Sequence, residues 1–184
     1  MNIESREAAA ALSDIEDVVR RVRQSRIYQL ASLMLIMWGA LVFIGYIGSF
    51  FLPRYAGYFW IALNVAGIAG SFAISAFGYP RTGVRTFDVR MLLAFLLFFA
   101  FGFLCTSVLG QFTPRQLGVF WPIYFMLLYI LAGLWFGHAF VAIGLGISTL
   151  ALIGYFFIGA WFELWMAFVD GGGLMLGGLW MRRS

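Results

Sequence analysis

Six stretches of apolar residues, each long enough to cross a bilayer as a helix, follow one another along the chain. They cover residues 28–51, 56–78, 91–110, 118–137, 139–158 and 161–181. A helix needs about 20 apolar residues to span the ~30 Å hydrocarbon layer. The strands of a membrane barrel instead alternate apolar and polar residues over about ten positions. The pattern therefore predicts an all-α integral membrane protein, with a six-helix transmembrane bundle over residues 28–184.

The breaks between these stretches differ in clarity. Proline and arginine separate the first two stretches at residues 52–55, and a polar segment at residues 79–90 separates the second from the third. Residues 118–181 run on with almost no charge. We place the two turns within them at Gly137-His138 and Gly159-Ala160, because glycine favours turns.

Residues 1–27 have a different, amphipathic pattern. Apolar side chains recur at three- and four-residue spacing opposite a charged side, which predicts a helix; the apolar positions are Leu12, Ile15, Val18, Val19 and Val22. We expect this helix to lie on the cytoplasmic membrane surface, with basic residues on anionic lipid headgroups; these are Arg20, Arg21, Arg23 and Arg26. The alternative is a docking helix for a cytoplasmic partner.

Composition and charge support a membrane protein with a defined orientation. The chain is 63% apolar and 11% charged, which excludes a water-soluble domain. Arginines near span ends collect in the cytoplasm, and six spans put all of them on that side except Arg54 and Arg115. This distribution predicts the inner (plasma) membrane, with both termini cytoplasmic. Because the arginines flank apolar stretches, the net charge of +4 does not indicate nucleic-acid binding.

Asp170 is the one carboxylate well inside a predicted span. Seven residues separate it from Glu163 at the outer end, which places it about 10 Å into the layer. An aspartate there costs on the order of 2.5 to 3.5 kcal/mol, so it normally faces the bundle interior. Three glycines follow it, and we expect the helix to unwind there. A broken helix beside a carboxylate is typical of ion and substrate sites in transporters.

Three polar residues in other spans are predicted to lie at a similar depth and to complete a site with Asp170. They are Asn64, Tyr124 and Thr106. Small residues also indicate close helix packing, which is the alternative role for the glycines after Asp170. The residues expected to pack closely are Ala62, Ala66, Gly70, Gly171, Gly172, Gly173 and Gly177.

The sequence contains no pattern that indicates an enzyme. Cys105 and His138 are each the only residue of their type, so one chain forms neither a disulfide nor a Cys/His zinc site. We expect no metal, no cofactor and no catalytic activity. Two functions remain: a transporter or channel for a small solute, proton or ion around Asp170, or a membrane-embedded scaffold or accessory subunit. Expected partners are the lipid bilayer and either a second copy or another membrane protein.

Overall fold

The computed structural model is all-α. It describes the backbone of residues 2–82 and 89–183, and the side chains of residues 12, 13, 15, 18, 28–75 and 93–183. In chain order the elements are α1 (Asn2–Phe51), the 3-10 turn η1 (Pro53–Tyr55), α2 (Ala56–Thr82), α3 (Val89–Val108), α4 (Pro114–Phe136), α5 (His138–Phe157), α6 (Phe162–Met166), the π-helical η2 (Ala167–Gly172) and α7 (Gly173–Arg183). The last three follow one another without a break, and we call them together the C-terminal span.

Five segments in the described part of the chain are long and apolar enough to cross a membrane. They are Tyr28–Phe51, Pro53–Ser75, Pro114–Phe136, His138–Phe157 and Phe162–Arg183. In α3 the apolar part is shorter, Leu93–Val108. A multi-pass helical membrane protein is therefore confirmed. The structure differs from the six-span expectation at α3, whose described apolar part is shorter than the other five.

Local sequence explains where the helices begin and end. α4 begins at Pro114, four residues before the predicted stretch, because Thr113 caps it. The Thr113 hydroxyl accepts from the backbone N–H of Gln116 at 3.3 Å, and the Gln116 side chain accepts from the backbone N–H of Thr113 at 2.8 Å. Both predicted turns are confirmed. Gly137 joins α4 to α5 with φ of 131°, a conformation that favours glycine, and the second turn follows Phe157.

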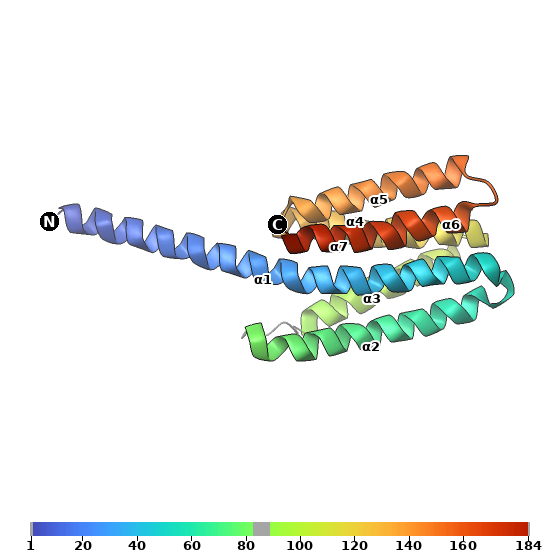
Figure 1. Cartoon of the computed structure of the whole chain (residues 1–184), viewed down its shortest axis with the longest axis horizontal. Helices are drawn as coiled ribbons and strands as arrows, with labels where there is room; N and C mark the ends of the chain where they lie inside the picture. Colours follow the sequence, from blue (N-terminus) through green and yellow to red (C-terminus); the bar gives the residue numbers. More distant parts are fainter. Residues whose placement is uncertain (1, 83–88, 184) are drawn as a thin grey trace.

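The N-terminal helix and the first span are one helix. α1 is continuous from Asn2 to Phe51, and Figure 1 shows its first half projecting beyond the end of the bundle at which the chain ends. The structure thus has no break at residue 28. The side chains of Arg20, Arg21, Arg23 and Arg26 lie outside the described residues, so their contact with lipid headgroups stays a prediction.

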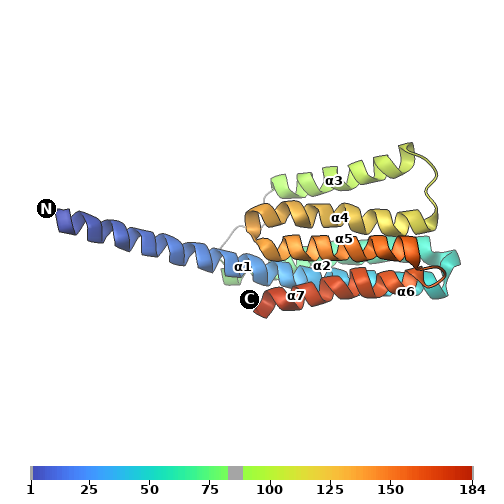
Figure 2. The same ribbon diagram turned by 90° about the horizontal axis from the view of Figure 1, so that it is seen from above.

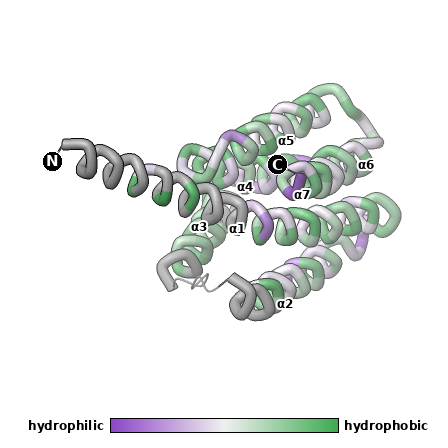
Figure 3. Tube along the Cα trace, turned by 60° about the vertical axis from the view of Figure 1, so that its left-hand side comes forward, coloured by the Kyte–Doolittle hydropathy of each residue, from purple (hydrophilic) through white to green (hydrophobic). Residues whose placement is uncertain are grey.

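Four helices form the centre of the bundle and two lie at its edges. α1, α4, α5 and the C-terminal span pack together, whereas α2 packs mainly on α1, and α3 on α4. Figures 1 and 2 show this arrangement from two directions. Apolar residues occur along all the helices of the bundle (Figure 3), and many are exposed, such as Val65, Leu97, Leu134 and Phe157. A surface of this kind suits lipid rather than water.

Two apolar clusters make up the interior. The first is built around Leu35, Met126, Phe140, Ile143, Ile147 and Leu174. The second, nearer the end with the α1–α2 connection, contains Tyr46, Val119, Ala151, Phe162, Met166 and Ala167. Each cluster contains residues of α1, of α5 and of the C-terminal span, so these helices connect the two halves of the interior.

The closest packing joins α1 to the C-terminal span. A Cβ atom at Gly39 would lie 2.7 Å from the carbonyl oxygen of Gly171 and 2.8 Å from the backbone nitrogen of Met175. Two turns earlier, the Ser32 hydroxyl donates to the carbonyl oxygen of Gly178 at 2.6 Å. Small residues let the two backbones approach this closely, as is common in membrane helices.

The small residues predicted to pack closely fall into two groups. A Cβ at Gly70, Gly171, Gly173 or Gly177 would meet a neighbouring helix within 3.0 Å, whereas at Gly172 it would meet nothing closer than 4.0 Å. Ala62 and Ala66 are exposed on α2. The side of α2 that faces α1 carries Gly67 and Ser71 instead, and Ser71 accepts a hydrogen bond from Trp38 at 3.1 Å. Packing of Ala62 and Ala66 on another molecule stays a prediction.

Candidate functional site

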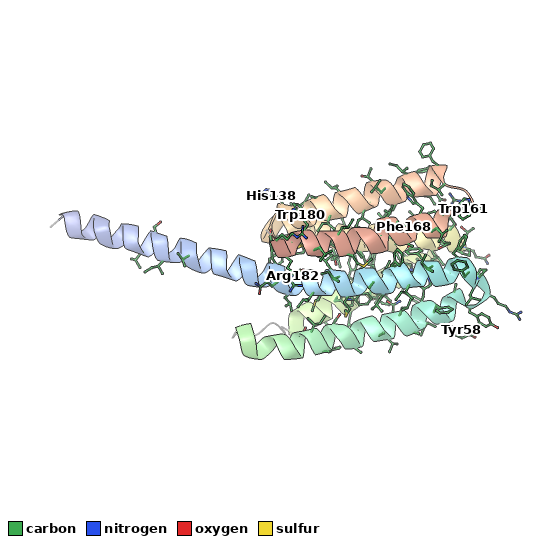
Figure 4. The ribbon with its side chains drawn as sticks, in the orientation of Figure 1. Tyr58, His138, Trp161, Phe168, Trp180 and Arg182 are labelled. Carbon is green, nitrogen blue, oxygen red and sulfur yellow. The ribbon has the colours of Figure 1, made fainter. Side chains whose placement is uncertain are left out.

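Asp170 lies in the bundle interior, at the boundary between the two apolar clusters. Its side chain is 4% exposed. Val169 and Leu174 of the same span belong to the first cluster, and Met166 and Ala167 belong to the second. Phe168, two residues earlier, points outward from the middle of the C-terminal span (Figure 4). The helix therefore turns this carboxylate inward, as predicted from depth, whereas the other carboxylate of the span, Glu163, is half-buried in its first turn.

The Asp170 carboxyl group has an oxygen without a partner. Oδ1 is buried and accepts no hydrogen bond from any described residue. Two other buried polar side chains in the described part of the chain have partners: Ser32 donates to Gly178, and Ser49 donates to Gly45 while accepting from Trp60. Buried polar groups in proteins normally find a partner, so Asp170 differs from the rest of this interior.

Asp170 lies in a widened stretch of helix. Residues Ala167–Gly172 adopt a π-helix, in which hydrogen bonds span five residues instead of four. The sequence had predicted unwinding at Gly171, Gly172 and Gly173, and the structure has a continuous helix instead. A π-helical turn keeps the backbone groups hydrogen-bonded, which matters where water is scarce. Gly171 also presses against the backbone of Phe43, which a side chain there would prevent.

None of the basic side chains that the structure describes compensates the charge of Asp170. Along its own helix the first arginine is Arg182, twelve residues later, which is about 18 Å at 1.5 Å per residue. Two tyrosines belong to the clusters at whose boundary Asp170 lies: Tyr46 is part of the second cluster, and Tyr129 packs against the first. The Tyr46 hydroxyl donates to the carbonyl oxygen of Gly118 at 2.6 Å, so its hydrogen is already used.

The predicted partners of Asp170 do not gather around it. The Asn64 amide donates to the Trp60 carbonyl of its own helix at 2.8 Å, and α2 packs mainly on the side of α1. Thr106 donates to Phe103 within α3. The Tyr124 hydroxyl donates across to the Phe98 carbonyl of α3 at 2.9 Å. Equal depth placed these residues at the right height, but depth does not determine which side of a helix faces the interior.

Sequence reasoning missed Arg115, which closes the end of α5. A helix leaves its last four carbonyl groups without partners, and here the Arg115 guanidinium contacts two of them and two carbonyl groups just after the helix. It donates to the carbonyl oxygens of Gly154 at 3.3 Å, Tyr155 at 2.6 Å, Ile158, and Gly159 at 3.2 Å. It also lies 4.9 Å from the centre of the Phe162 ring. Two features could have indicated this role. Arg115 lies at the end of the bundle where α5 ends, and α5 has no polar cap of its own there.

The described residues offer no metal centre. They contain no group of three or more His, Cys, Asp or Glu side chains that could hold a metal ion. Cys105 is half-buried in α3, and His138 is exposed at the start of α5 (Figure 4). The site that remains is the buried Asp170 carboxyl group, whose Oδ1 accepts no hydrogen bond from the described residues. Such a group can take up a proton or a small cation.

Comparison with known proteins adds no constraint on this site. No protein-family model, no curated protein and no solved structure matches the chain.

Proposed function

We propose that this protein is a transporter or channel for a small solute, proton or ion, in which Asp170 binds the transported species. Among these we take the proton as the leading cargo. In this proposal the protein crosses the inner (plasma) membrane six times, with α3 as the third span, and both termini lie in the cytoplasm. It has no enzymatic activity.

The observation that carries the proposal is the unpartnered Asp170 Oδ1 in a π-helical stretch. Leaving a buried acceptor unsatisfied costs about 1–3 kcal/mol, and more for a charged group. A purely structural residue at this position would be apolar or hydrogen-bonded. Ionisable residues inside membranes commonly mark ion and proton pathways, and π-helical turns are frequent at functional sites.

The donor set around Asp170 favours a proton over a divalent cation. Calcium takes six to eight oxygen ligands, and magnesium demands an octahedron. Around Asp170 the described side chains are mostly apolar, and the Tyr46 hydroxyl is engaged with Gly118. A proton needs only one carboxylate oxygen, and that oxygen is present.

The proposed orientation follows from the arginines. Arg182 lies at the end of the bundle where the chain ends, which is also the end from which α1 projects (Figure 4). Arg54 and Arg115 lie at the other end, within η1 and at the start of α4. Since arginines accumulate on the cytoplasmic side, we assign the end with both termini to the cytoplasm.

A second candidate is a membrane-embedded scaffold or accessory subunit. The observation that favours it is the projecting part of α1, whose described apolar side chains Leu12, Ile15 and Val18 are exposed. Purification in mild detergent separates the two functions. An accessory subunit brings down a stoichiometric partner, whereas a transporter that works alone yields only this chain.

Proton flux in liposomes tests the leading proposal. Full-length protein is reconstituted with a pH-sensitive dye inside the vesicles, and a potassium gradient with valinomycin drives protons across. We expect the unmodified protein to acidify the lumen faster than empty liposomes. Asp170→Asn removes the titratable group at nearly constant shape and should reduce the rate to that of empty liposomes.

Asp17→Asn is the matched control, because it makes the same chemical change in the part of α1 outside the bundle. This variant should keep the full rate. Wild-type flux equal to that of empty liposomes, or full flux in Asp170→Asn, would contradict the proposal.

A further inference from the structure

The projecting part of α1 carries an apolar stripe without a partner in the described part of the chain. Leu12, Ile15 and Val18 are 62%, 60% and 59% exposed. Because α1 is continuous with the first span, this stripe stands off the end of the bundle (Figure 1). Residues 2–27 would extend for about 39 Å at 1.5 Å per residue. Large exposed apolar side chains in such a segment indicate an interaction surface.

The stripe follows the seven-residue repeat of a coiled coil. Positions called a and d alternate at spacings of four and three residues. Here Leu12 and Val19 occupy a, and Ala8, Ile15 and Val22 occupy d. The repeat is thus kept over five successive core positions. An amphipathic helix that only meets lipid has no need of this strict alternation.

The segment is not arranged to lie flat on the membrane. Sharp bends in helices arise mostly at proline, glycine or similar interruptions. The sequence contains neither proline nor glycine before Gly39, and α1 passes through residue 28 without a break. The helix therefore leaves the bundle in the direction of the first span, without a turn at residue 28.

The membrane fixes how two copies would meet. Every copy inserts with the same orientation, so their α1 helices run parallel and equal heptad positions lie at equal height. In a parallel coiled coil, a g residue faces the e residue of the next heptad on the neighbouring helix. These pairs are Glu4 with Ala9, Ala11 with Glu16, and Val18 with Arg23. None of them places like charges opposite each other.

The side-chain types favour more than two copies. Leucine at a combined with isoleucine at d shifts parallel coiled coils toward trimers and tetramers. Leu12 and Ile15 have this combination. Val18 at g widens the apolar surface beyond a and d, and it is exposed in the single chain.

The same surface continues onto the bundle. Gln29 is two heptads after Ile15, and Leu33 is three heptads after Leu12. Both side chains are exposed, Leu33 by 48%. Arg26 at a and Gln29 at d interrupt the apolar stripe. Beyond them, the same side of α1 reaches the bundle at Leu33, where neither α2 nor the C-terminal span covers it. Neighbouring copies can approach along it without displacing another helix.

From these observations we propose that the projecting part of α1 forms a parallel coiled coil with two or three further copies of this chain, which joins their transmembrane bundles into one assembly. The proposal does not depend on transport through Asp170.

Disulfide cross-linking tests the contact directly. Cys105 is the only cysteine, so Cys105→Ser gives a cysteine-free background in which single cysteines are placed in α1. Leu12→Cys lies at the core of the repeat, and Ser13→Cys is its exposed neighbour at position b. In membranes treated with a mild thiol oxidant, Leu12→Cys should form disulfide-linked dimers, whereas Ser13→Cys should remain monomeric. Equal cross-linking of the two variants overturns the proposal.

The mass of the detergent-solubilised protein gives a second, independent reading. Native mass spectrometry should find three or four chains for the wild type. Ile15→Asp places a charge in the repeat and should release single chains, whereas Ser13→Asp should leave the assembly intact. If the wild-type protein is found as a single chain, which is the result expected if the stripe binds lipid, the proposal is overturned. An assembly that persists in Ile15→Asp overturns it as well.

Discussion

Replacing Gly39 by alanine should weaken the packing of α1 on the C-terminal span. The added methyl group would lie 2.7 Å from the carbonyl oxygen of Gly171, and an ordinary contact begins at 3.4 Å. Three atoms obstruct it, and two of them, this oxygen and the nitrogen of Met175, belong to the backbone, so rotating the Met175 side chain does not make room. The two helices would have to separate by about 0.7 Å at this point.

The cost of that separation can be estimated from packing. A gap of 0.5–1 Å already forfeits a quarter to a half of each dispersion contact across it. Forcing a methyl group into a filled interior typically costs about 1–3 kcal/mol, which exceeds the gain of up to about 1 kcal/mol that alanine brings to a helix. We therefore expect Gly39→Ala to lower the free energy of unfolding.

Gly146→Ala is the matched control. A Cβ at Gly146, in the middle of α5, would meet nothing within 4 Å. This variant should be neutral or stabilised by up to about 1 kcal/mol. Thermal unfolding in detergent, followed by tryptophan fluorescence, measures both variants. If Gly39→Ala unfolds at the same temperature as Gly146→Ala, the close approach of α1 to the C-terminal span is refuted.

Two further substitutions test contacts that hold the bundle together. Ser32→Ala removes the hydrogen bond to Gly178 and should lower the free energy of unfolding by about 0.6 kcal/mol, the average for side-chain bonds between membrane helices; no change in the same assay speaks against this bond. Arg115→Gln leaves the last carbonyl groups of α5 without their charged donor and should cost about 1.5–3 kcal/mol. Faster amide hydrogen exchange after residue 154 should accompany it, and unchanged exchange contradicts the capping role.

Helix positions were predictable from sequence because they depend on local pattern. The membrane-spanning stretches can be recognised by the length of their apolar runs. The turn at residue 137 can be recognised because glycine is the residue type that readily adopts its positive φ angle. The early start of α4 was missed because its cap is polar and lies before the apolar run, at Thr113 and Gln116. The continuity of α1 was missed because its change of composition near residue 28 resembles a boundary.

The candidate site was predicted only in part, because contacts between helices are not local. The inward direction of Asp170 followed from the cost of exposing a carboxylate to lipid. Its neighbours depend on which helices are adjacent, and α1 separates Asn64 from it by packing between α2 and the C-terminal span. Gly39 and Ser32 carry the closest contact, yet in sequence they are single small residues within a long apolar run.

Chemical labelling of Asp170 tests the central claim most directly. Dicyclohexylcarbodiimide is an apolar reagent that reaches protonated carboxyl groups inside membranes, and mass spectrometry locates and quantifies the modification. The account predicts labelling at Asp170 and a proton flux that falls in proportion to the labelled fraction of protein. Complete labelling of Asp170 with undiminished flux would contradict it.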